Sequence, residues 1–167
     1  MEEFALLMRG QLDMRHEAQA LRTFRHNFGS DKASRDVVTF PEPVTDLCTK
    51  QVLVEEFQAG EAMGHYLTRI RKEGRDSDEA LNERIAKLGL HAILKMIFED
   101  NYIHADLHAG NIIVRLADFR NTDKTSENAF VSLIDAGLVA ELSVENRRNL
   151  IDLFSAIISN EGGDAGR

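Results

Sequence analysis

The sequence predicts a single domain of the α+β class, and three observations support that prediction. Amphipathic helical periodicity recurs along the chain, short β-rich runs lie between the helical segments, and 167 residues suffice for one hydrophobic core. A chain of about 150 residues buries roughly 68–70% of the surface that its unfolded form exposes. Disulfides are therefore not required, which agrees with the presence of one cysteine.

The first predicted element is a long amphipathic helix over residues 3–28. Apolar residues recur there at seven-residue spacing on one side, namely Leu7, Met14, Leu21 and Phe28. The residues at 29–31 end the helix. A short strand over 37–40 follows, and it stops at Pro41 and Pro43 because proline cannot donate a hydrogen bond to a neighbouring strand.

The middle of the chain is predicted to contain one strand and two helices. Alternating β-branched residues predict a strand over 51–57, closed by Gly60. A short helix is expected over 61–71. A longer helix over 77–99 begins at Ser77, which is a good N-cap residue.

The last third of the chain is predicted to form a hairpin followed by a helix. The runs 112–115 and 130–134 are apolar and rich in β-formers, and the polar stretch 121–128 separates them. This pattern is typical of a hairpin with a long tip. Ser143, followed by Glu145, caps the final helix.

The charge balance excludes several classes of function. Twenty basic and twenty-eight acidic residues give a net charge of −8, which argues against broad binding to nucleic acid or to anionic membranes. No apolar run approaches the roughly 20 residues of a membrane span. Residues 1–21 carry charges instead of a continuous apolar stretch, so no signal peptide is expected there.

The segment that carries chemistry is residues 104–111, HADLHAGN, followed by Asp-Ala-Gly at 135–137. A hairpin between Asn111 and Asp135 brings these two residues together, so that an amide oxygen and a carboxylate share a hard cation such as Mg²⁺. Asp106 is then placed to accept or orient a proton on an attacking hydroxyl. This arrangement is typical of kinase-type phosphoryl transfer.

Two other interpretations compete with that one. His104, Asp106 and His108 would hold a transition metal for hydrolysis in the first, but this leaves Asn111 and Gly137 without a role. In the second, the histidines and Asp106 are ordinary loop residues in a hydrogen-bond network. The length of the matching pattern favours phosphoryl transfer over both.

On these residues the chain resembles the UbiB, or aarF-domain-containing, family of atypical protein-kinase-like proteins. The family's catalytic-loop signature, H-A-D-x-H-x-G-N, is matched by residues 104–111, and residues 134–137 stand where the family has its D-F-G element. Residues 12–28 resemble the family's αC helix. Residues 41–43 and 52–60 resemble its strands 4 and 5 with the hinge that holds adenine.

The resemblance implies a protein-kinase-like fold, mainly the helical C-lobe with the αC helix and hinge strands, and with an incomplete N-lobe. The expected domain is a partial UbiB/aarF-type domain over 1–167. Residues 1–60 are then the remnant of the N-lobe, and 61–167 are the C-lobe with its catalytic loop, truncated at its end. No lysine precedes Glu17, so this chain alone is predicted to be inactive in phosphoryl transfer.

The resemblance also implies roles for individual residues. Glu17 is the helix glutamate that pairs with the strand-3 lysine, and Asp106 is the catalytic aspartate. Asn111 and Asp135 are the magnesium ligands, and together they hold the nucleotide's phosphates through the metal. The implied cofactors are ATP and Mg²⁺.

Adenine is expected to meet backbone groups near Glu56 and Gln58. Three departures from the family pattern accompany these matches. Glu55 places a charge at the gatekeeper position in front of the adenine pocket, Ala136 replaces the usual phenylalanine, and Gln11 replaces the first carboxylate of the family's E-x-D element.

The implied function is ATP binding, with ATPase or phosphotransfer activity in a full-length protein linked to ubiquinone or mitochondrial lipid metabolism. The implied location is mitochondrial. The implied partners are a nucleotide and a lipid or quinone-pathway protein, with membrane association through regions outside this chain. The alternatives are a catalytically silent regulatory or scaffold module and, less favoured, the His/Asp metal-dependent hydrolase.

Overall fold

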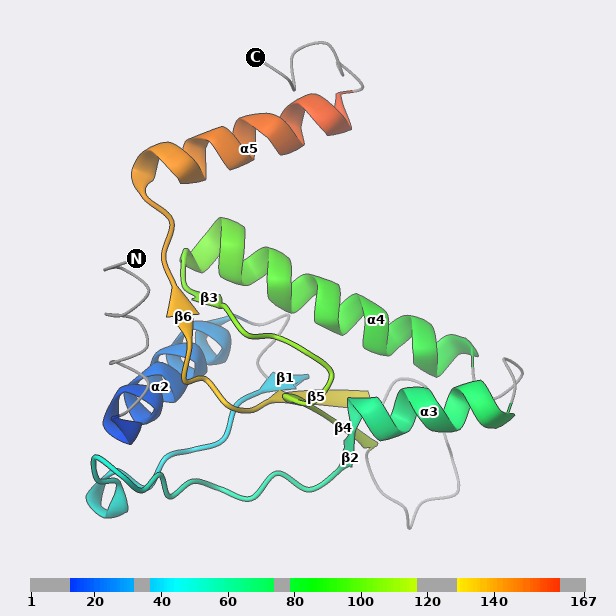
Figure 1. Ribbon diagram of the computed structural model, residues 1–167. Helices are drawn as coiled ribbons and strands as arrows, with labels where there is room; N and C mark the ends of the chain where they lie inside the picture. Colours follow the sequence, from blue (N-terminus) through cyan, green and yellow to red (C-terminus); the bar gives the residue numbers. More distant parts are fainter. Residues whose placement is uncertain (1–12, 32–36, 74–78, 117–128, 160–167) are drawn as a thin grey trace.

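The computed structural model describes residues 13–31, 37–73, 79–116 and 129–159, and within these ranges the chain forms two sheets and several helices (Figure 1). The larger sheet has the strand order β1 (Val38–Thr39), β5 (Ala129–Leu133), β4 (Ile112–Leu116) and β2 (Glu61–Ala62). The smaller sheet pairs β3 (Ile103–His104) with β6 (Val139–Ala140). The predicted mixture of helices and strands is confirmed.

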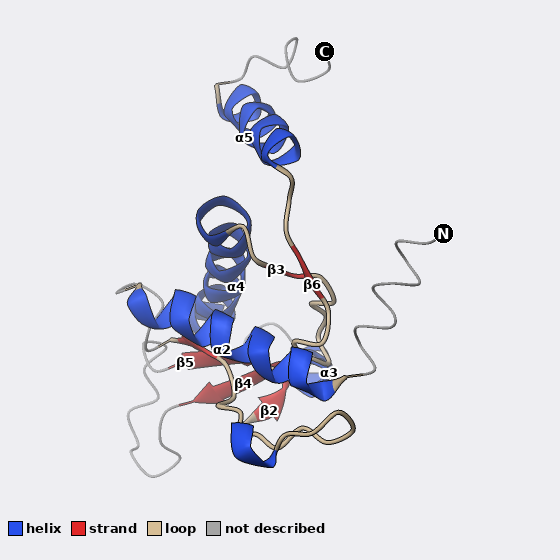
Figure 2. Cartoon of the chain, turned by 90° about the vertical axis from the view of Figure 1, so that its left-hand side faces the viewer, coloured by secondary structure: helices blue, strands red, loops and turns tan. Residues whose placement is uncertain are grey.

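The helical segments lie against the larger sheet or extend beyond it (Figure 1). They are α2 (Met14–Ser30), η1 (Thr45–Leu47), α3 (Met63–Glu73), α4 (Glu79–Leu94), η2 (Lys95–Asp100) and α5 (Val144–Ile158). Figures 1 and 2 show α4 passing over the sheet and α5 standing apart from it at the far end of β6. No helix in the described ranges is long and apolar enough to cross a membrane.

Helix α2 confirms the second half of the first predicted helix. It begins after Asp13, whose side chain accepts a hydrogen bond from the Arg15 backbone N–H at 3.1 Å and so acts as the N-cap. Residues 3–12 of the predicted helix lie outside the described residues. The helix ends at Ser30, two residues beyond its predicted end, with Gly29 inside it.

The core is built on the buried face of α2. The Phe24 ring stacks on Phe40 with the ring centres 4.8 Å apart and the planes 4° from parallel, and it meets Tyr102 at the same separation. Phe28 lies against Phe40 at 5.1 Å. Helix α2 is therefore attached to β1 and to the loop before β3 by one aromatic cluster.

The predicted hairpin is confirmed. Strands β4 and β5 pair antiparallel over five residues, from Ile112 opposite Leu133 to Leu116 opposite Ala129. The polar tip at 117–128 lies outside the described residues. Strand β1 then adds to β5 in parallel, which places the 37–40 strand beside the hairpin.

The strand predicted over 51–57 is wrong. In place of a strand the structure has one isolated antiparallel bridge, between Pro43 and Glu55. Two backbone hydrogen bonds flank that bridge, from Val44 N–H to the Val54 carbonyl at 2.8 Å and from Glu56 N–H to the Glu42 carbonyl at 2.9 Å. The facing segment contains prolines, which have no N–H to donate, so the ladder cannot extend.

The next two helices differ from their predictions at their ends. Residues 61–62 form β2, so the helix predicted over 61–71 is α3 and begins at Met63. The helix predicted over 77–99 is regular only as far as Leu94, and Ser77 lies outside the described residues. Residues 95–100 form η2, a π-helical turn that extends one residue beyond the predicted end.

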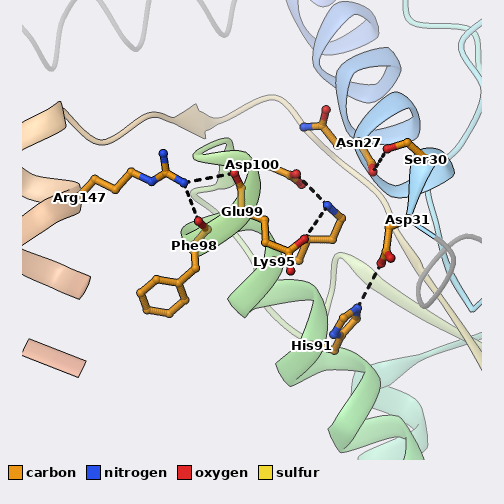
Figure 3. A network of polar contacts seen from close by, with 9 residues as sticks. All are labelled: Asn27, Ser30, Asp31, His91, Lys95, Phe98, Glu99, Asp100 and Arg147. Atoms are coloured by element: carbon orange, nitrogen blue, oxygen red, sulfur yellow. Dashed lines mark hydrogen bonds and ion pairs between the residues drawn. The ribbon is translucent and has the colours of Figure 1, made fainter. Parts of the chain in front are cut away.

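The η2 turn is closed by a buried lysine (Figure 3). The Lys95 ammonium donates to Asp100 at 2.8 Å and to Glu99 at 3.2 Å, and the side chain is 5% exposed. Burial opposes the charged form of Lys95, but these two hydrogen bonds outweigh it and raise the pKa. The buried Lys95 ammonium is thus paired with two carboxylates of the same π-helical turn.

Helix α5 is fastened to the end of η2. Arg147 donates to the backbone carbonyl of Phe98 at 2.6 Å and to that of Glu99 at 3.3 Å (Figure 3). Just beyond η2, the Asn101 side chain forms two hydrogen bonds with the backbone of Leu142. The predicted capping of α5 is confirmed, because the Ser143 hydroxyl accepts a hydrogen bond from the Asn146 N–H at 3.1 Å.

Candidate functional site

His104 organises the HADLHAGN segment. Its ring is buried, and Nε2 lies 3.2 Å from the carbonyl oxygen of Ile134, while Nδ1 accepts the Asp106 N–H at 3.3 Å. A ring that accepts at Nδ1 carries its proton on Nε2, so these contacts assign the neutral tautomer. His104 therefore ties the loop to the end of β5 with both of its nitrogens.

Asp106 combines a fixed backbone with an open side chain. Its N–H is bound to His104, and its carbonyl accepts from the Asn111 side-chain amide at 3.1 Å. The carboxylate itself is 57% exposed to solvent. A reacting group that enters from solvent can therefore reach this carboxylate without a rearrangement of the loop.

Asn111 and Asp135 lie at the same end of the hairpin. The Ile134 N–H donates to the Asn111 carbonyl at 2.9 Å, directly beyond the Ile112–Leu133 pair. Asn111 is buried, whereas Asp135 is exposed. Asp135 also has a positive φ of 57°, a backbone conformation that non-glycine residues adopt at a cost and that is frequent at functional sites.

Helix α2 brings Glu17 against the Asp-Ala-Gly turn. A Cβ added to Gly137 would lie 3.5 Å from Glu17 Oε2 and 3.4 Å from Asp135 Oδ1, so the turn and the two carboxylates are in close proximity. Burial raises the pKa of Glu17 to about 7, with further contributions from the negative charges of Asp135 and Glu55. A hydrogen bond from the Ala136 N–H opposes this rise.

Glu55 is the third carboxylate of this group. Burial, followed by the charge of Asp135, raises its pKa. Its Oε2 atom is buried and has no hydrogen-bond partner within the described ranges. No ion pair links Glu17 or Glu55 to a basic side chain among the residues that the structure places. The negative charge of these carboxylates is therefore not balanced by a basic side chain among the described residues.

The two predicted hinge residues lie beside the same sheet. The Glu56 N–H is used in the hydrogen bond to Glu42. The Gln58 side chain accepts from the buried hydroxyl of Ser132 in β5 at 2.9 Å. Sequence reasoning missed Ser132, and the available signal was a polar residue in the middle of the otherwise apolar run Val131 to Ile134.

The arrangement of the histidines does not form a metal site. His108 Nδ1 accepts the Gly110 N–H at 2.9 Å, and His108 Nε2 lies 3.9 Å from Asp106 Oδ2. Within the described part of the chain, no three His, Cys, Asp or Glu side chains are grouped so that they could hold a metal ion. The geometry therefore gives no support to the hydrolase interpretation.

We expect the purified chain to carry no stoichiometric zinc, because both ring nitrogens of His104 already make hydrogen bonds within the chain. Elemental analysis by mass spectrometry measures this directly. Zinc that is retained at one equivalent and lost in both His104→Ala and His108→Ala would contradict the expectation. His65→Ala, on the exposed surface of α3, is the matched control.

We expect Glu17→Gln to stabilise the protein at pH 8 and to leave its stability unchanged at pH 4. The pKa of Glu17 rises from 4.5 to about 7 on folding, so its protonated form favours the native state. The stability that the protonated Glu17 contributes to the native state is fully present below pH 4.5 and is lost as the pH rises through 7. A full shift of this size corresponds to about 3 kcal/mol, which partial exposure reduces to about 1–2 kcal/mol.

Urea unfolding of the two proteins between pH 4 and pH 8 measures this difference. Glu141→Gln removes an exposed glutamate that is not among the charges acting on Glu17 or Glu55, and it is the control. A stability difference that does not vary with pH would show that Glu17 is not the titrating group.

A hairpin preceded by an Asp-x-x-x-x-Asn loop and followed by Asp-x-Gly, with a helix glutamate beside the second aspartate, defines an atypical kinase-like domain. Comparison with known families identifies which one. The model of the ABC1 atypical kinase-like domain matches residues 1–164, and the chain belongs to this family. The predicted family is thereby confirmed, since the relatives of the chain include both mitochondrial ABC1 proteins and UbiB.

Three relatives illustrate the similarity. A mitochondrial ABC1 family protein of Schizosaccharomyces pombe is 28% identical over 98% of this chain and 27% of its own length. The probable serine/threonine-protein kinase abkC of Dictyostelium discoideum is 36% identical over 77% of this chain and 17% of its own. The probable protein kinase UbiB of Aliivibrio fischeri is 28% identical over 93% of this chain and 26% of its own.

A solved structure shares the fold. It is a Mycobacterium tuberculosis protein in complex with erythromycin, which matches with a TM-score of 0.52 and 21% identity over 79% of this chain and 28% of that protein. The chain thus spans less than a third of the length of these proteins. The four matches cover between 77% and 98% of this chain and between 17% and 28% of each relative.

Proposed function

We propose that this chain supplies the catalytic loop and the metal-binding hairpin of an ABC1 atypical kinase-like domain, and that it binds a nucleotide together with Mg²⁺. The observation that carries the proposal is the base of the hairpin. His104 and the Ile134–Asn111 hydrogen bond hold Asn111 next to Asp135. An amide and a carboxylate in this setting are the oxygen ligands that Mg²⁺ takes when it also binds phosphates.

The unbalanced carboxylates support the presence of a cation. Burial, followed by the charge of Asp135, raises the pKa of both Glu17 and Glu55, and Glu55 Oε2 is buried without a partner in the described residues. A divalent ion held by Asp135 and Asn111 would reduce this effect of the Asp135 charge. When bound, Mg²⁺ neutralises phosphate charge.

Each remaining residue then has a defined task. Asp106 orients a hydroxyl nucleophile, because its backbone is fixed on both sides and its carboxylate is open. Glu17 accepts a cationic partner next to the Asp-Ala-Gly turn. Backbone groups of Glu56 and Gln58 meet the base of the nucleotide.

Calorimetric titration tests the proposal. We expect Mg-ADP and Mg-ATP to bind, and we expect binding to weaken at least tenfold when EDTA removes the metal. Magnesium without nucleotide and nucleotide without magnesium are the controls. The absence of heat and of any thermal stabilisation at millimolar Mg-ADP would overturn the proposal, because a ligand of the native state must raise its stability.

A catalytically silent module is the second candidate. The observation that favours it is Glu17, which neighbours two carboxylates and has no basic partner among the described residues. Phosphoryl transfer depends on a cation at this point. We expect nucleotide binding without magnesium-dependent ATP hydrolysis above an Asp135→Ala control. Turnover that this substitution abolishes would contradict the silent module.

We also propose a mitochondrial location and a link to ubiquinone or lipid metabolism. The support is the family and the names of two fungal relatives, both of which are called mitochondrial. Partnership with a lipid or a quinone-pathway protein follows from the same family membership. Microscopy of the tagged protein tests the location.

A further inference from the structure

We propose that Lys95 and Asp100 are positioning residues of the candidate site. Their ion pair selects the π-helical form of η2, and this form places the loop at 104–111 so that Asn111 can ligate the metal. The inference rests on the proposed binding of a nucleotide with Mg²⁺. It gives a role in ligand binding to a buried cation that the proposed function leaves without a task.

The pair fits a π-helical turn and does not fit an α-helix. Lys95 and Asp100 are five positions apart, and the Lys95 ammonium lies 2.8 Å from the Asp100 carboxylate (Figure 3). On an α-helix, neighbouring side chains are three or four positions apart, so residues i and i+5 point in different directions. The hydrogen bonds of a π-helix run between residues i and i+5, and this wider turn brings the two side chains together. The ion pair therefore favours the π-helical form over the α-helical one.

The surroundings of the pair make this preference strong. The Lys95 side chain is 5% exposed and that of Asp100 is 12% exposed. The Lys95 ammonium also lies over the Phe28 ring of α2, 5.4 Å from its centre. Asp100 Oδ2 is buried without a hydrogen-bond partner in the described ranges, so this carboxylate depends on Lys95 at its other oxygen. A buried charge that loses its partner is costly, and the π-helical turn avoids that cost.

The η2 turn determines how the chain leaves α4. The Met96 carbonyl accepts from the Asn101 N–H and, at 3.0 Å, from the Tyr102 N–H. Asn101 has a positive φ of 49°, a conformation common just beyond a helix end. The Tyr102 ring then lies 4.8 Å from that of Phe24 on α2. Because a π-turn closes one residue later than an α-turn, an α-helical end would carry Tyr102 away from Phe24.

The residues after Tyr102 transmit this placement to the proposed metal ligand. Ile103 and His104 pair with β6, and His104 Nδ1 accepts the Asp106 N–H. The Asp106 carbonyl in turn accepts from the side-chain amide of Asn111 at 3.1 Å. The orientation of the Asn111 side chain therefore depends on where η2 releases the chain.

A double substitution separates position from stability. Lys95→Met alone leaves a buried carboxylate without its cation and should lower the melting temperature by about 10 °C. Lys95→Met together with Asp100→Leu replaces both charges by apolar groups and should bring the melting temperature to within about 3 °C of wild type. We expect this double variant to bind Mg-ADP about tenfold more weakly in titration calorimetry, because its end of α4 is no longer held in the π-helical form.

A spectroscopic signal reports the position of the loop independently of binding. The chain has two tyrosines and no tryptophan, so the near-ultraviolet circular dichroism of tyrosine is sensitive to the packing of Tyr102. We expect this signal to change in the double variant. The matched control is Glu83→Leu with Lys87→Met, which removes an exposed ion pair from the same helix. It should leave both the signal and the affinity as in wild type.

The two carboxylate partners of Lys95 provide a second comparison. Glu99 lies four positions from Lys95, so its ion pair is compatible with an α-helix, whereas that of Asp100 is not. We expect Asp100→Asn to weaken Mg-ADP binding about tenfold and Glu99→Gln to change it by no more than about twofold. This comparison decides the matter if the double variant does not regain the wild-type melting temperature.

The outcomes distinguish the inference from the proposed function. Failure of the wild-type chain to bind Mg-ADP overturns the proposed function and the inference with it. Wild-type affinity and an unchanged tyrosine signal in a stable double variant overturn the inference alone, because the pair then contributes to stability only. Equal affinities in Asp100→Asn and Glu99→Gln overturn it as well.

Discussion

Replacing Phe24 by alanine is expected to lower the free energy of unfolding by about 3–5 kcal/mol, the usual cost of deleting a buried phenylalanine ring. The Phe24 side chain has no solvent exposure and touches Phe40, Tyr102 and His104. In a chain of this size, such a loss lowers the melting temperature by about 10 °C. Calorimetry or circular dichroism measures this shift.

Phe57 provides the matched control for Phe24. Its side chain is 88% exposed, so Phe57→Ala should change stability by no more than about 0.5 kcal/mol. Should Phe24→Ala not fold, Phe24→Leu leaves a smaller cavity and a measurable transition. A Phe24→Leu variant as stable as wild type would show that α2 does not pack on the core as described.

Replacing Asp135 by asparagine is expected to weaken Mg-ADP binding at least tenfold and, at the same time, to stabilise the free protein slightly. Asparagine tolerates the positive φ of this position as aspartate does, so the substitution removes a charge without a change of backbone. The free protein becomes more stable because the repulsion of Asp135 with Glu17 and Glu55 is removed. The affinity for Mg-ADP falls because the substitution removes a proposed metal ligand.

The opposite signs of these two effects identify a functional carboxylate. Titration calorimetry gives the affinity, and urea unfolding gives the stability of the free protein. Asp152→Asn, an exposed change on α5, should alter neither quantity. Loss of stability together with loss of binding in Asp135→Asn would indicate a structural role instead.

The hairpin was predictable because its evidence is local. Two apolar β-rich runs separated by a polar stretch permit few other arrangements, and the observed pairing of β4 with β5 follows from them. The proximity of Asn111 to Asp135 follows from the hairpin in turn. The loop at 104–111 was likewise recognisable from the spacing of Asp106 and Asn111, whose chemical roles stay predictions.

The remaining features depend on contacts that no local pattern encodes. Alternating β-branched residues at 51–57 favour a strand, but the facing prolines decide how much of a ladder forms. The π-helical end of α4 depends on Lys95 meeting Asp100. The hydrogen bond from Ser132 to Gln58 joins residues 74 positions apart, and helical or strand periodicity carries no information about it.

The fastening of α5 to η2 has a consequence for how this protein tolerates mutation. Arg147 binds the backbone carbonyls of Phe98 and Glu99, and every amino acid at those two positions offers the same oxygen atoms. Substitutions on the η2 side therefore leave the acceptors in place, whereas nearly any substitution of Arg147 removes the donor. This hydrogen-bonded contact therefore depends on the side chain at position 147 and only on backbone atoms at positions 98 and 99, so we expect substitution of Arg147 to weaken it most.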